Sequence, residues 1–175
     1  SDVCKVWEEE ILKAKEFGVR TVAYRLGMVL GHDGGALNKI LPPFKLGLGG
    51  KLGSGSQWMS WIHINDLVNM LVHAIENLSI DGIYNAVSPN AVRNKEFTKT
   101  LGKILKRPTI CPVPKFVLKV VLGELSELLL GSQRVNANKI SDTGFKFKYP
   151  HIQEALKEVC GNTYHEIKTE QWVPQ

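Results

Sequence analysis

The sequence predicts an α/β fold, in which the strands of a parallel sheet alternate with amphipathic helices. The strongest observation is a nearly continuous apolar run at residues 19–30, which is typical of a strand buried on both faces of a parallel sheet. Apolar residues recur at helical spacing on either side of this run, at 2–17 and 67–78. Shorter apolar segments at 61–64 and 83–87 predict further strands, so that strands and helices alternate along the chain.

The composition excludes several classes of protein. The 175 residues fit one ordinary domain or one and a half small ones, and 43% hydrophobic residues are enough for a core. The best membrane-span candidate, residues 116–130, is interrupted by charged residues, so we expect a core helix and no membrane partner. The start of the chain shows no signal-peptide pattern. The net charge of +5 is spread along the chain without a Lys/Arg cluster, so we expect no nucleic-acid partner.

The cysteines and histidines show no pattern that would bind a metal. Cys4, Cys111 and Cys160 are an odd number without ligand-like spacing, and the five histidines are scattered. We therefore expect reduced thiols in a cytoplasmic protein, with no disulfide and no metal site.

The first helix, at 2–17, is expected to end at Gly18, because glycine is the usual C-cap residue. After the long apolar strand, a second helix is predicted over 36–44. Pro42 and Pro43 are expected to kink or end this helix.

A glycine-rich stretch from Pro42 to Leu67 is the next feature of the chain. Glycines recur between Gly47 and Gly55, so the backbone there can adopt positive φ or approach a ligand closely. Loops this long in compact domains are usually either functional or disordered, and the aromatic and aliphatic residues at 58–62 favour order. We expect this loop to border a ligand site, and a well-packed structural lid is the alternative.

Capping residues and alternation predict the rest of the chain. Asn65 or Asp66 is expected to cap the helix at 67–78, and Asn94 a later helix that Pro108 stops. Beyond it the pattern predicts an extended segment at 109–113, a helical region at 115–130, a short helix opening at 131–134, a half-exposed strand at 145–149, a helix at 152–159 capped by Gly161, and an alternating segment at 164–173.

An ordered series of motifs runs through most of the chain, from Asp2 to about Val159. It comprises residues 25–31 (Arg25-Leu26-Gly27-Met28-Val29-Leu30-Gly31), 34–37, 41–50, 53–55, 61–64, 66–67, 85–89 and 131–135 (Gly131-Ser132-Gln133-Arg134-Val135). The series resembles the epimerase-like atypical short-chain dehydrogenase/reductases of the NAD(P)-binding Rossmann superfamily.

This resemblance implies the C-terminal part of an extended short-chain dehydrogenase Rossmann fold with a small α+β substrate lobe, at residues 1–161. The family's glycine-rich phosphate loop is not found in these 175 residues, so we expect the missing N-terminal half of the same protein to be a partner. Residues 162–175 would be a linker. Within them, 165–174 resemble the first strand of a downstream START-like domain, and a disordered tail is the alternative.

The resemblance also implies NADP as the cofactor of the intact protein. Gly27, Met28 and Val29 lie where the family contacts the nicotinamide end, mainly through backbone. The first helix would be the one that carries the Tyr-x-x-x-Lys pair. If Glu8 marks that helix, Cys4 stands at the lysine position, and a cysteine does not lower a tyrosine pKa or hold a ribose. The catalytic residues are therefore unassigned.

The substrate is expected to be a small molecule, of nucleotide-sugar type if the resemblance extends that far. Gln57, Trp58, Trp61 and Arg134 are expected to border its cleft, although core packing of Trp61 and a surface ion pair of Arg134 are alternatives. His63, between two isoleucines, is interpreted as a core residue in preference to a catalytic base.

Three functions follow from these patterns. The first is a fragment of an NADP-linked oxidoreductase or nucleotide-sugar-epimerase-like enzyme that contributes the substrate lobe. The second is a non-catalytic NADP-binding or redox-sensing module that lacks the Tyr/Lys pair, and the third is a structural lobe fused to a hydrophobe-binding domain. A phosphate loop with a proton donor upstream would favour the enzyme.

Overall fold

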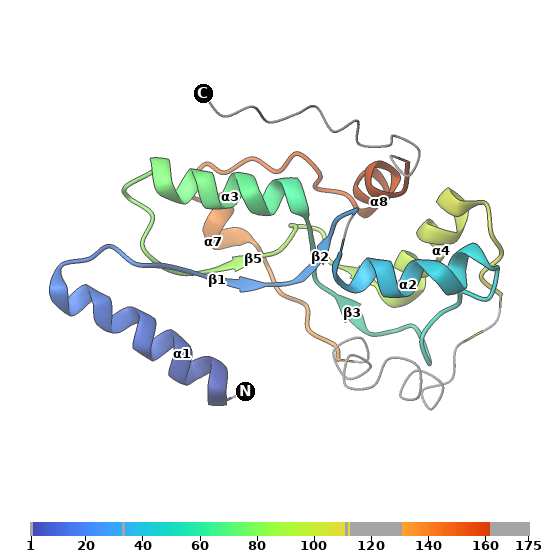
Figure 1. Ribbon diagram of the computed structural model, residues 1–175, viewed down its shortest axis with the longest axis horizontal. Helices are drawn as coiled ribbons and strands as arrows, with labels where there is room; N and C mark the ends of the chain where they lie inside the picture. Colours follow the sequence, from blue (N-terminus) through green and yellow to red (C-terminus); the bar gives the residue numbers. More distant parts are fainter. Residues whose placement is uncertain (1, 33, 111, 113–130, 162–175) are drawn as a thin grey trace, which may run out of the picture.

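The computed structural model describes residues 2–32, 34–110, 112 and 131–161 (Figure 1). The predictions for 115–130, for the tail after Gly161 and for Cys111 lie outside the described residues. The elements are α1 (Asp2–Leu12), the 3₁₀ helix η1 (Lys13–Phe17), β1 (Val22–Leu26), β2 (Met28–Leu30), α2 (Gly35–Lys45), β3 (Trp58–Met59), β4 (Trp61–His63), α3 (Ile64–Glu76), β5 (Gly82–Ala86), β6 (Val92–Arg93), α4 (Asn94–Leu105), α7 (Asn138–Ser141) and α8 (Ile152–Gly161). The predicted α/β class is confirmed.

Gly27 divides the predicted strand at 19–30 into two strands with different partners. β1 pairs in parallel with β5, and β2 pairs in parallel with β4. The Gly27 N–H donates to Ala86 O at 3.2 Å, and the Met28 N–H donates to Ser60 O at 2.9 Å. A Cβ on Gly27 would lie 2.8 Å from both Ser60 O and Val87 Cγ1, so only glycine fits where the chain changes partner.

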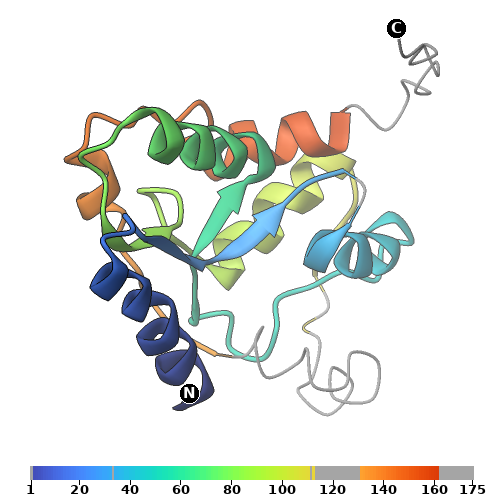
Figure 2. The same cartoon turned by 60° about the vertical axis from the view of Figure 1, so that its left-hand side comes forward.

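The expectation that this strand is buried on both faces is wrong for β1. Leu26 is 61% exposed, and Val22, Ala23 and Tyr24 are half-buried. Among the described residues, β5 is the one strand that pairs with β1, which leaves its other edge uncovered. Helices α3 and α8 lie on one side of the strands and α1 on the other (Figures 1 and 2).

Two apolar cores lie on either side of β4. Trp61 packs with Leu30 and residues of α2, α4 and α8, whereas Ile62 packs with Met70 and residues of α3, β5 and α7. Successive side chains of a strand point to opposite faces, so this short strand contributes to both cores. Trp61, Ile62 and His63 are all fully buried.

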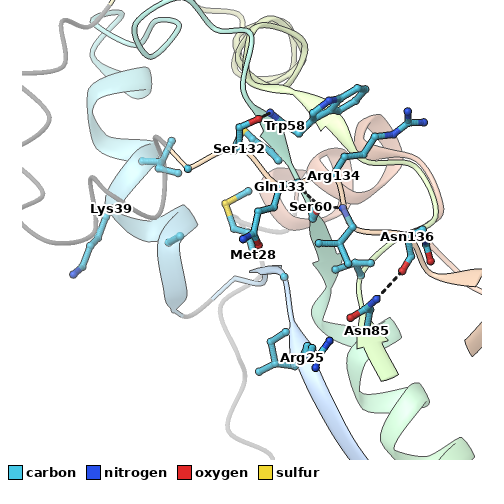
Figure 3. A pocket seen from close by; sticks show the side chains of 18 residues that line it. Arg25, Met28, Lys39, Trp58, Ser60, Asn85, Ser132, Gln133, Arg134 and Asn136 are labelled. Atoms are coloured by element: carbon cyan, nitrogen blue, oxygen red, sulfur yellow. Dashed lines mark hydrogen bonds between the residues drawn. The ribbon is translucent and has the colours of Figure 1, made fainter. Parts of the chain in front are cut away.

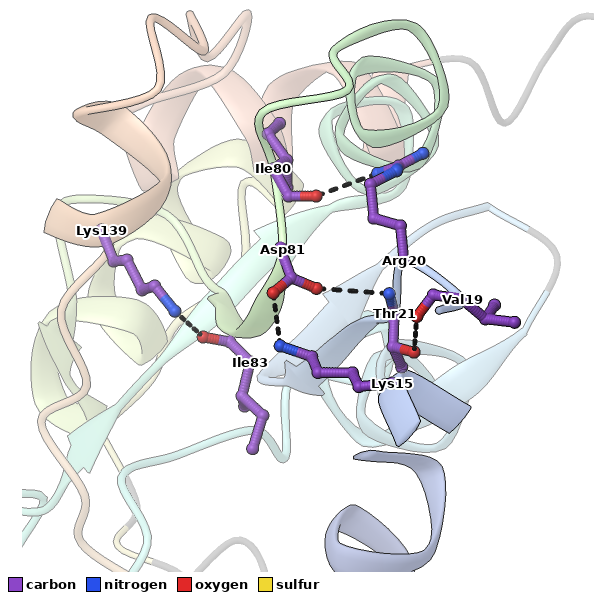
Figure 4. Close-up of polar contacts among 8 residues, drawn as sticks. All are labelled: Lys15, Val19, Arg20, Thr21, Ile80, Asp81, Ile83 and Lys139. Atoms are coloured by element: carbon purple, nitrogen blue, oxygen red, sulfur yellow. Dashed lines mark hydrogen bonds and ion pairs between the residues drawn. The ribbon is translucent and has the colours of Figure 1, made fainter. Parts of the chain in front are cut away.

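The first helix is held mainly by polar contacts. It is α-helical to Leu12 and 3₁₀ to Phe17, and it ends at Gly18, whose φ of 73° confirms the predicted C-cap. No residue of α1 or η1 is buried. The Lys15 ammonium pairs with Asp81 (Figure 4).

The turn before β5 receives several further bonds to the start of β1 (Figure 4). Asp81 Oδ1 accepts from the Thr21 N–H at 3.2 Å, and Arg20 Nη1 donates to Ile80 O at 2.9 Å. Lys139 of α7 donates to Ile83 O at 2.7 Å. These bonds fix where β1 and β5 begin and so set the register of the pair.

The predicted caps of two helices are wrong by one to three residues. His63, not Asn65 or Asp66, is the N-cap of α3, and its Nδ1 accepts from the Asn65 N–H at 3.1 Å. Asp66 is fully buried and accepts from the Lys148 and Tyr149 N–H groups at 2.7 and 2.9 Å.

Arg93, not Asn94, is the N-cap of α4, and it makes no side-chain capping bond. The Asn94 side chain instead accepts from the Leu52 N–H at 2.8 Å. Helix α2 continues two residues beyond Pro42 and Pro43, because the φ of proline suits a helix and Phe44 is buried in the core.

Two predicted elements near the end of the described chain are absent. Residues 131–134 are not helical, because their polar groups bond to the ends of the strands. Residues 145–149 form no strand, because the N–H groups of Lys148 and Tyr149 bond to Asp66 in place of a neighbouring strand. The helix predicted at 152–159 is α8. Within the described residues, every helix is too short or too polar to span a membrane.

Candidate functional site

A pocket of about 960 Å³ lies at the carboxyl ends of the parallel strands β1 and β5, beside α2 (Figure 3). In open α/β sheets, ligands bind in the crevice beyond the carboxyl ends of strands. The pocket is lined by Arg25, Leu26, Gly27, Met28, Ala36, Lys39, Ile40, Trp58, Met59, Ser60, Asn85, Val87, Gly131, Ser132, Gln133, Arg134, Val135 and Asn136.

Residues 131–136, which we call the strap, form one wall of the pocket. Ser60 Oγ donates to Gln133 O at 2.8 Å and accepts from the Val135 N–H at 3.0 Å. The Trp58 N–H donates to Ser132 Oγ at 3.1 Å. At the far end of the strap, Asn85 Nδ2 donates to Asn136 O at 3.2 Å (Figure 3). The strap is therefore fixed to β3, β5 and the residue between β3 and β4.

The charged side chains that line the pocket are all cationic. No aspartate or glutamate is among the lining residues, which include Arg25, Lys39 and Arg134. Glu8 of α1 binds Arg25 through two bonds of 2.6 Å, which lower the pKa of Glu8 and raise that of Arg25. In the described parts of the chain, Lys39 and Arg134 form no ion pair. The lining therefore favours an anionic ligand.

Trp58 lies beside two arginines at one end of the pocket. The Arg134 guanidinium carbon is 4.7 Å from the centroid of the Trp58 ring, and that of Arg93, outside the lining, is 3.8 Å away. Figure 3 shows Trp58 and Arg134 next to each other. Cation–π attraction acts at such distances.

The three residues predicted to contact the cofactor occupy different surroundings. Gly27 and the side chain of Met28 line the pocket, whereas Val29 pairs with Ile62 and does not. The N–H groups of Gly27 and Met28 already donate within the sheet. The expected backbone contact with the cofactor would therefore be made by carbonyl oxygens of these residues, and the Met28 side chain would lie beside them.

The four residues predicted to border the substrate cleft are also divided. Trp58 and Arg134 line the pocket. Gln57 is buried outside the lining, and its Nε2 donates to Leu52 O at 3.2 Å. Trp61 is fully buried in a core, as the alternative interpretation had it, and its Nε1 donates to Asn90 O at 3.0 Å. Trp61 does not line this pocket, because its position on β4 directs it into the core.

Most of the glycine-rich loop lies away from the pocket. Of the residues from Pro42 to Leu67, only 58–60 line it. A Cβ on Gly49 would overlap the Phe44 ring, and Gly55 has a φ of 71°. These two glycines are required for packing and for a turn, as in a structural lid.

Several lining residues were not predicted, among them Lys39, Ser60, Asn85 and Gln133. Asn85 lies near the carboxyl end of β5, and Ser60 lies between two short strands. Their positions at strand ends were a usable signal, because this is where α/β folds place ligands. Nothing in the local sequence marks Lys39, which the folding of α2 brings to the pocket.

His63 lies outside the pocket in a buried polar cluster. Its Nδ1 accepts from the Asn65 N–H, so the ring proton is on Nε2, which lies 2.7 Å from Glu158 Oε2. The Tyr149 ring centroid is 4.0 Å from that of His63. Burial raises the pKa of Glu158, but the bonds from His63 and His32 outweigh it and lower that pKa below its ordinary value. The interpretation of His63 as a core residue fits this geometry.

Two family models match the chain. The model of the NAD dependent epimerase/dehydratase family matches residues 2–86, and a domain of unknown function (DUF1731) matches residues 113–159. The first match includes both parallel strand pairs and the pocket residues of β1, α2 and β5.

Named relatives and solved structures agree with these matches. The Arabidopsis thaliana "Epimerase family protein SDR39U1 homolog, chloroplastic" is 45% identical over 159 residues, which are 91% of this chain and 46% of that protein. The human epimerase family protein SDR39U1 (isoform 2), solved with NADPH, is 41% identical with a TM-score of 0.78, covering 82% of this chain and 49% of that one.

A third relative is the nucleoside-diphosphate sugar epimerase from Corynebacterium glutamicum, which is 34% identical with a TM-score of 0.68 over 90% of this chain and 30% of that one. The chain spans about half the length of the curated relatives it matches. The expected resemblance is confirmed: the chain is similar to epimerase family proteins over most of its length, and its residues 2–86 match the model of the NAD dependent epimerase/dehydratase family.

Proposed function

We propose that this chain supplies the substrate-binding part of an NADP-linked oxidoreductase or nucleotide-sugar-epimerase-like enzyme. The observation that carries the proposal is the pocket at the carboxyl ends of β1 and β5, whose charged lining residues are all cationic. Its position is where α/β folds bind nucleotides, and its charge suits a phosphorylated ligand.

NADP is the proposed cofactor. The human relative was solved with NADPH, which supports this choice. The residues present are compatible with it, because the apolar Met28 side chain can lie against a nicotinamide while the cationic lining attracts phosphate. The proposed substrate is a small nucleotide-sugar-like molecule, supported by the likeness to the nucleoside-diphosphate sugar epimerase from Corynebacterium glutamicum. A cytoplasmic location is part of the same proposal.

A preceding half of the same protein is the proposed partner. Helix α1 exposes Trp7 and Ile11, and Phe17 and Leu26 are also exposed next to the uncovered edge of β1. Exposed apolar patches beside an unpaired strand edge mark surfaces that another segment covers. That half would supply the glycine-rich phosphate loop. We therefore propose that residues 1–175 alone do not bind NADP at micromolar concentration.

A non-catalytic NADP-binding or redox-sensing module is the second candidate. One observation favours it: the pocket lining contains no tyrosine, and its one lysine is Lys39 of α2 and not a residue of α1. A Tyr/Lys pair of the usual kind is thus not formed by the lining residues that the structure describes.

Calorimetry with NADPH on the whole gene product tests the proposed function. Met28→Glu places an anion in the pocket and should weaken NADPH binding by about tenfold or more. Val68→Glu adds the same charge on the exposed face of α3 and should leave the affinity unchanged. Equal affinity in both variants would refute the cofactor assignment. Oxidation of NADPH with a panel of nucleotide sugars then separates the enzyme from the sensor.

A further inference from the structure

Arg93, Trp58 and Arg134 form what we call the arginine–tryptophan cluster. Both guanidinium carbons lie within cation–π distance of one indole, at 3.8 Å for Arg93 and 4.7 Å for Arg134. The two guanidiniums therefore cannot be farther apart than the sum of these distances. Trp58 and Arg134 also line the pocket, so the cluster stands at its edge (Figure 3).

The backbone around the cluster is fixed by bonds from neighbouring elements. Arg93 lies opposite Trp58 in the β3–β6 pair, and its Nη1 donates to Ser56 O. Arg134 lies between two strap residues whose backbone groups both bond to Ser60 Oγ. The backbone at both arginines is thus fixed before any ligand arrives, which reduces the entropy lost on binding.

The charges of the cluster are not balanced. Neither Arg93 nor Arg134 forms an ion pair with a carboxylate in the described parts of the chain. Arg93 is also the N-cap residue of α4, and its side chain makes no capping bond there. Glu96 lies in the first turn of α4 but pairs with neither arginine among the described contacts.

Two like charges on one ring are an unfavourable arrangement that an anion would relieve. Natural sequences break such local rules mainly at functional sites. We propose that Arg93 and Arg134 together bind a phosphate or diphosphate group of the pocket's ligand, and that Trp58 positions both guanidiniums. Planar guanidiniums match phosphate oxygens through paired hydrogen bonds.

This inference rests on the proposed function only in taking the pocket as the ligand site. It adds Arg93, which is outside the lining, and gives Trp58 a positioning role. With both arginines on its ring, Trp58 acts through them and not as a platform for a sugar. NADP plays no part in the measurement, so the two proposals can fail separately.

Pyrophosphate is the probe, added to the 175-residue chain in a thermal-unfolding experiment with calorimetry. Binding to the native state raises the melting temperature. We expect pyrophosphate to raise it in the wild type and in the control Arg107→Gln, which removes an exposed arginine elsewhere. Arg93→Gln and Arg134→Gln should each weaken pyrophosphate binding by about tenfold or more, because each loses charge-assisted hydrogen bonds.

The positioning role of Trp58 has its own variants. Trp58→Leu should weaken pyrophosphate binding several-fold, whereas Trp58→Phe should retain most of it because the aromatic face remains. If Trp58→Leu does not fold, the comparison of Trp58→Phe with the arginine variants still separates the roles. Equal loss in Trp58→Phe and Arg134→Gln would refute a positioning role.

The melting temperature without ligand separates binding from packing. Removing one arginine relieves repulsion between the two guanidiniums but also loses its contact with the Trp58 ring. Without pyrophosphate, Arg93→Gln and Arg134→Gln should therefore melt close to the wild-type temperature. A clear decrease would indicate structural arginines and overturn the proposal. Three other results would also overturn the proposal. Pyrophosphate could fail to stabilise the wild type, it could stabilise both arginine variants as much as the wild type, or the dicarboxylate malonate could stabilise the wild type equally well.

Discussion

The imidazole of His63 donates from Nε2 to Glu158 Oε2 across 2.7 Å, and this bond joins β4 to α8. His63 is fully buried and Glu158 is partly exposed, so the bond lies at the boundary between the core and water. His32, between β2 and α2, approaches the other oxygen of Glu158 at 3.4 Å. One carboxylate thus connects three parts of the fold.

Stability should fall at acid pH partly through Glu158. Its pKa in the folded chain is below the ordinary value of 4.5, so the carboxylate stabilises the fold above pH 4.5. That contribution is lost as the pH falls below 4.5 towards the lower folded pKa. We expect Glu158→Gln to be less stable at pH 7 by about 1–3 kcal/mol, since it loses a hydrogen bond to a charged group.

Urea unfolding of both proteins from pH 7 to pH 3 checks this expectation. The stability difference should narrow as the pH decreases, because the wild-type carboxyl becomes protonated and resembles the amide. A difference that stays constant over this range would show that the ionisation of Glu158 does not contribute.

Gly27→Ala should destabilise the chain by about 1–3 kcal/mol, because the new Cβ would meet Ser60 O and Val87 Cγ1 at 2.8 Å. Gly34→Ala is the matched control, since a Cβ there meets nothing within 4 Å and its φ of 174° is extended. Equilibrium unfolding in urea measures the stability of both variants. Equal stability of the two variants would mean that the junction between β1 and β2 can move aside.

Gly49→Ala tests the role of the glycine-rich loop. Its Cβ would overlap the Phe44 ring inside the core, so we expect a loss of about 1–3 kcal/mol of stability. Because Gly49 does not line the pocket, pyrophosphate affinity of the folded variant should stay within about twofold of the wild type. If Gly49→Ala weakened pyrophosphate binding without lowering the free energy of unfolding, the glycine-rich loop would border the ligand site.

Ser60→Ala should loosen the strap, because Ser60 Oγ bonds to both Gln133 O and the Val135 N–H. Loss of these bonds is expected to reduce stability by about 1 kcal/mol and to weaken pyrophosphate binding several-fold by freeing Arg134. Ser79→Ala removes an exposed serine hydroxyl that bonds only locally, to Asn77, and is the control. Calorimetry measures the pyrophosphate affinity of both variants. Equal affinities would show that the strap does not position Arg134.

The sequence was a reliable guide where local patterns determine local structure. The apolar stripes located the longer helices, although α7 was not predicted. Gly18 was correctly assigned as a C-cap, because that position needs a left-handed backbone conformation, which glycine adopts readily. The parallel strand after it was also predicted correctly, since β1 and β2 both pair in parallel. These features depend on neighbours within a few residues.

Errors arose where distant groups decide the outcome. Asp66 resembles an N-cap in sequence, but the N–H groups of Lys148 and Tyr149 reach its carboxylate from more than eighty positions away. The same bonds prevent a strand at 145–149. No local pattern encodes such pairings.

The predicted site residues coincide only in part with the pocket lining, for a similar reason. Met28 and Arg134 belong to motifs that the family resemblance marked, and both line the pocket. Trp61 belongs to such a motif too, yet on β4 it faces a core. Arg93 carries no motif, and its place on Trp58 follows only from the pairing of β3 with β6.

The alternation of β4 also bears on how the molecule unfolds. Trp61 is part of one core and Ile62 of the other, so neither core can open far without withdrawing the same three-residue strand from its partner. Opening of the two regions is thereby coupled. Slowly exchanging amide protons of α3 and α4 should then share one exchange free energy, as expected when a single cooperative unit opens.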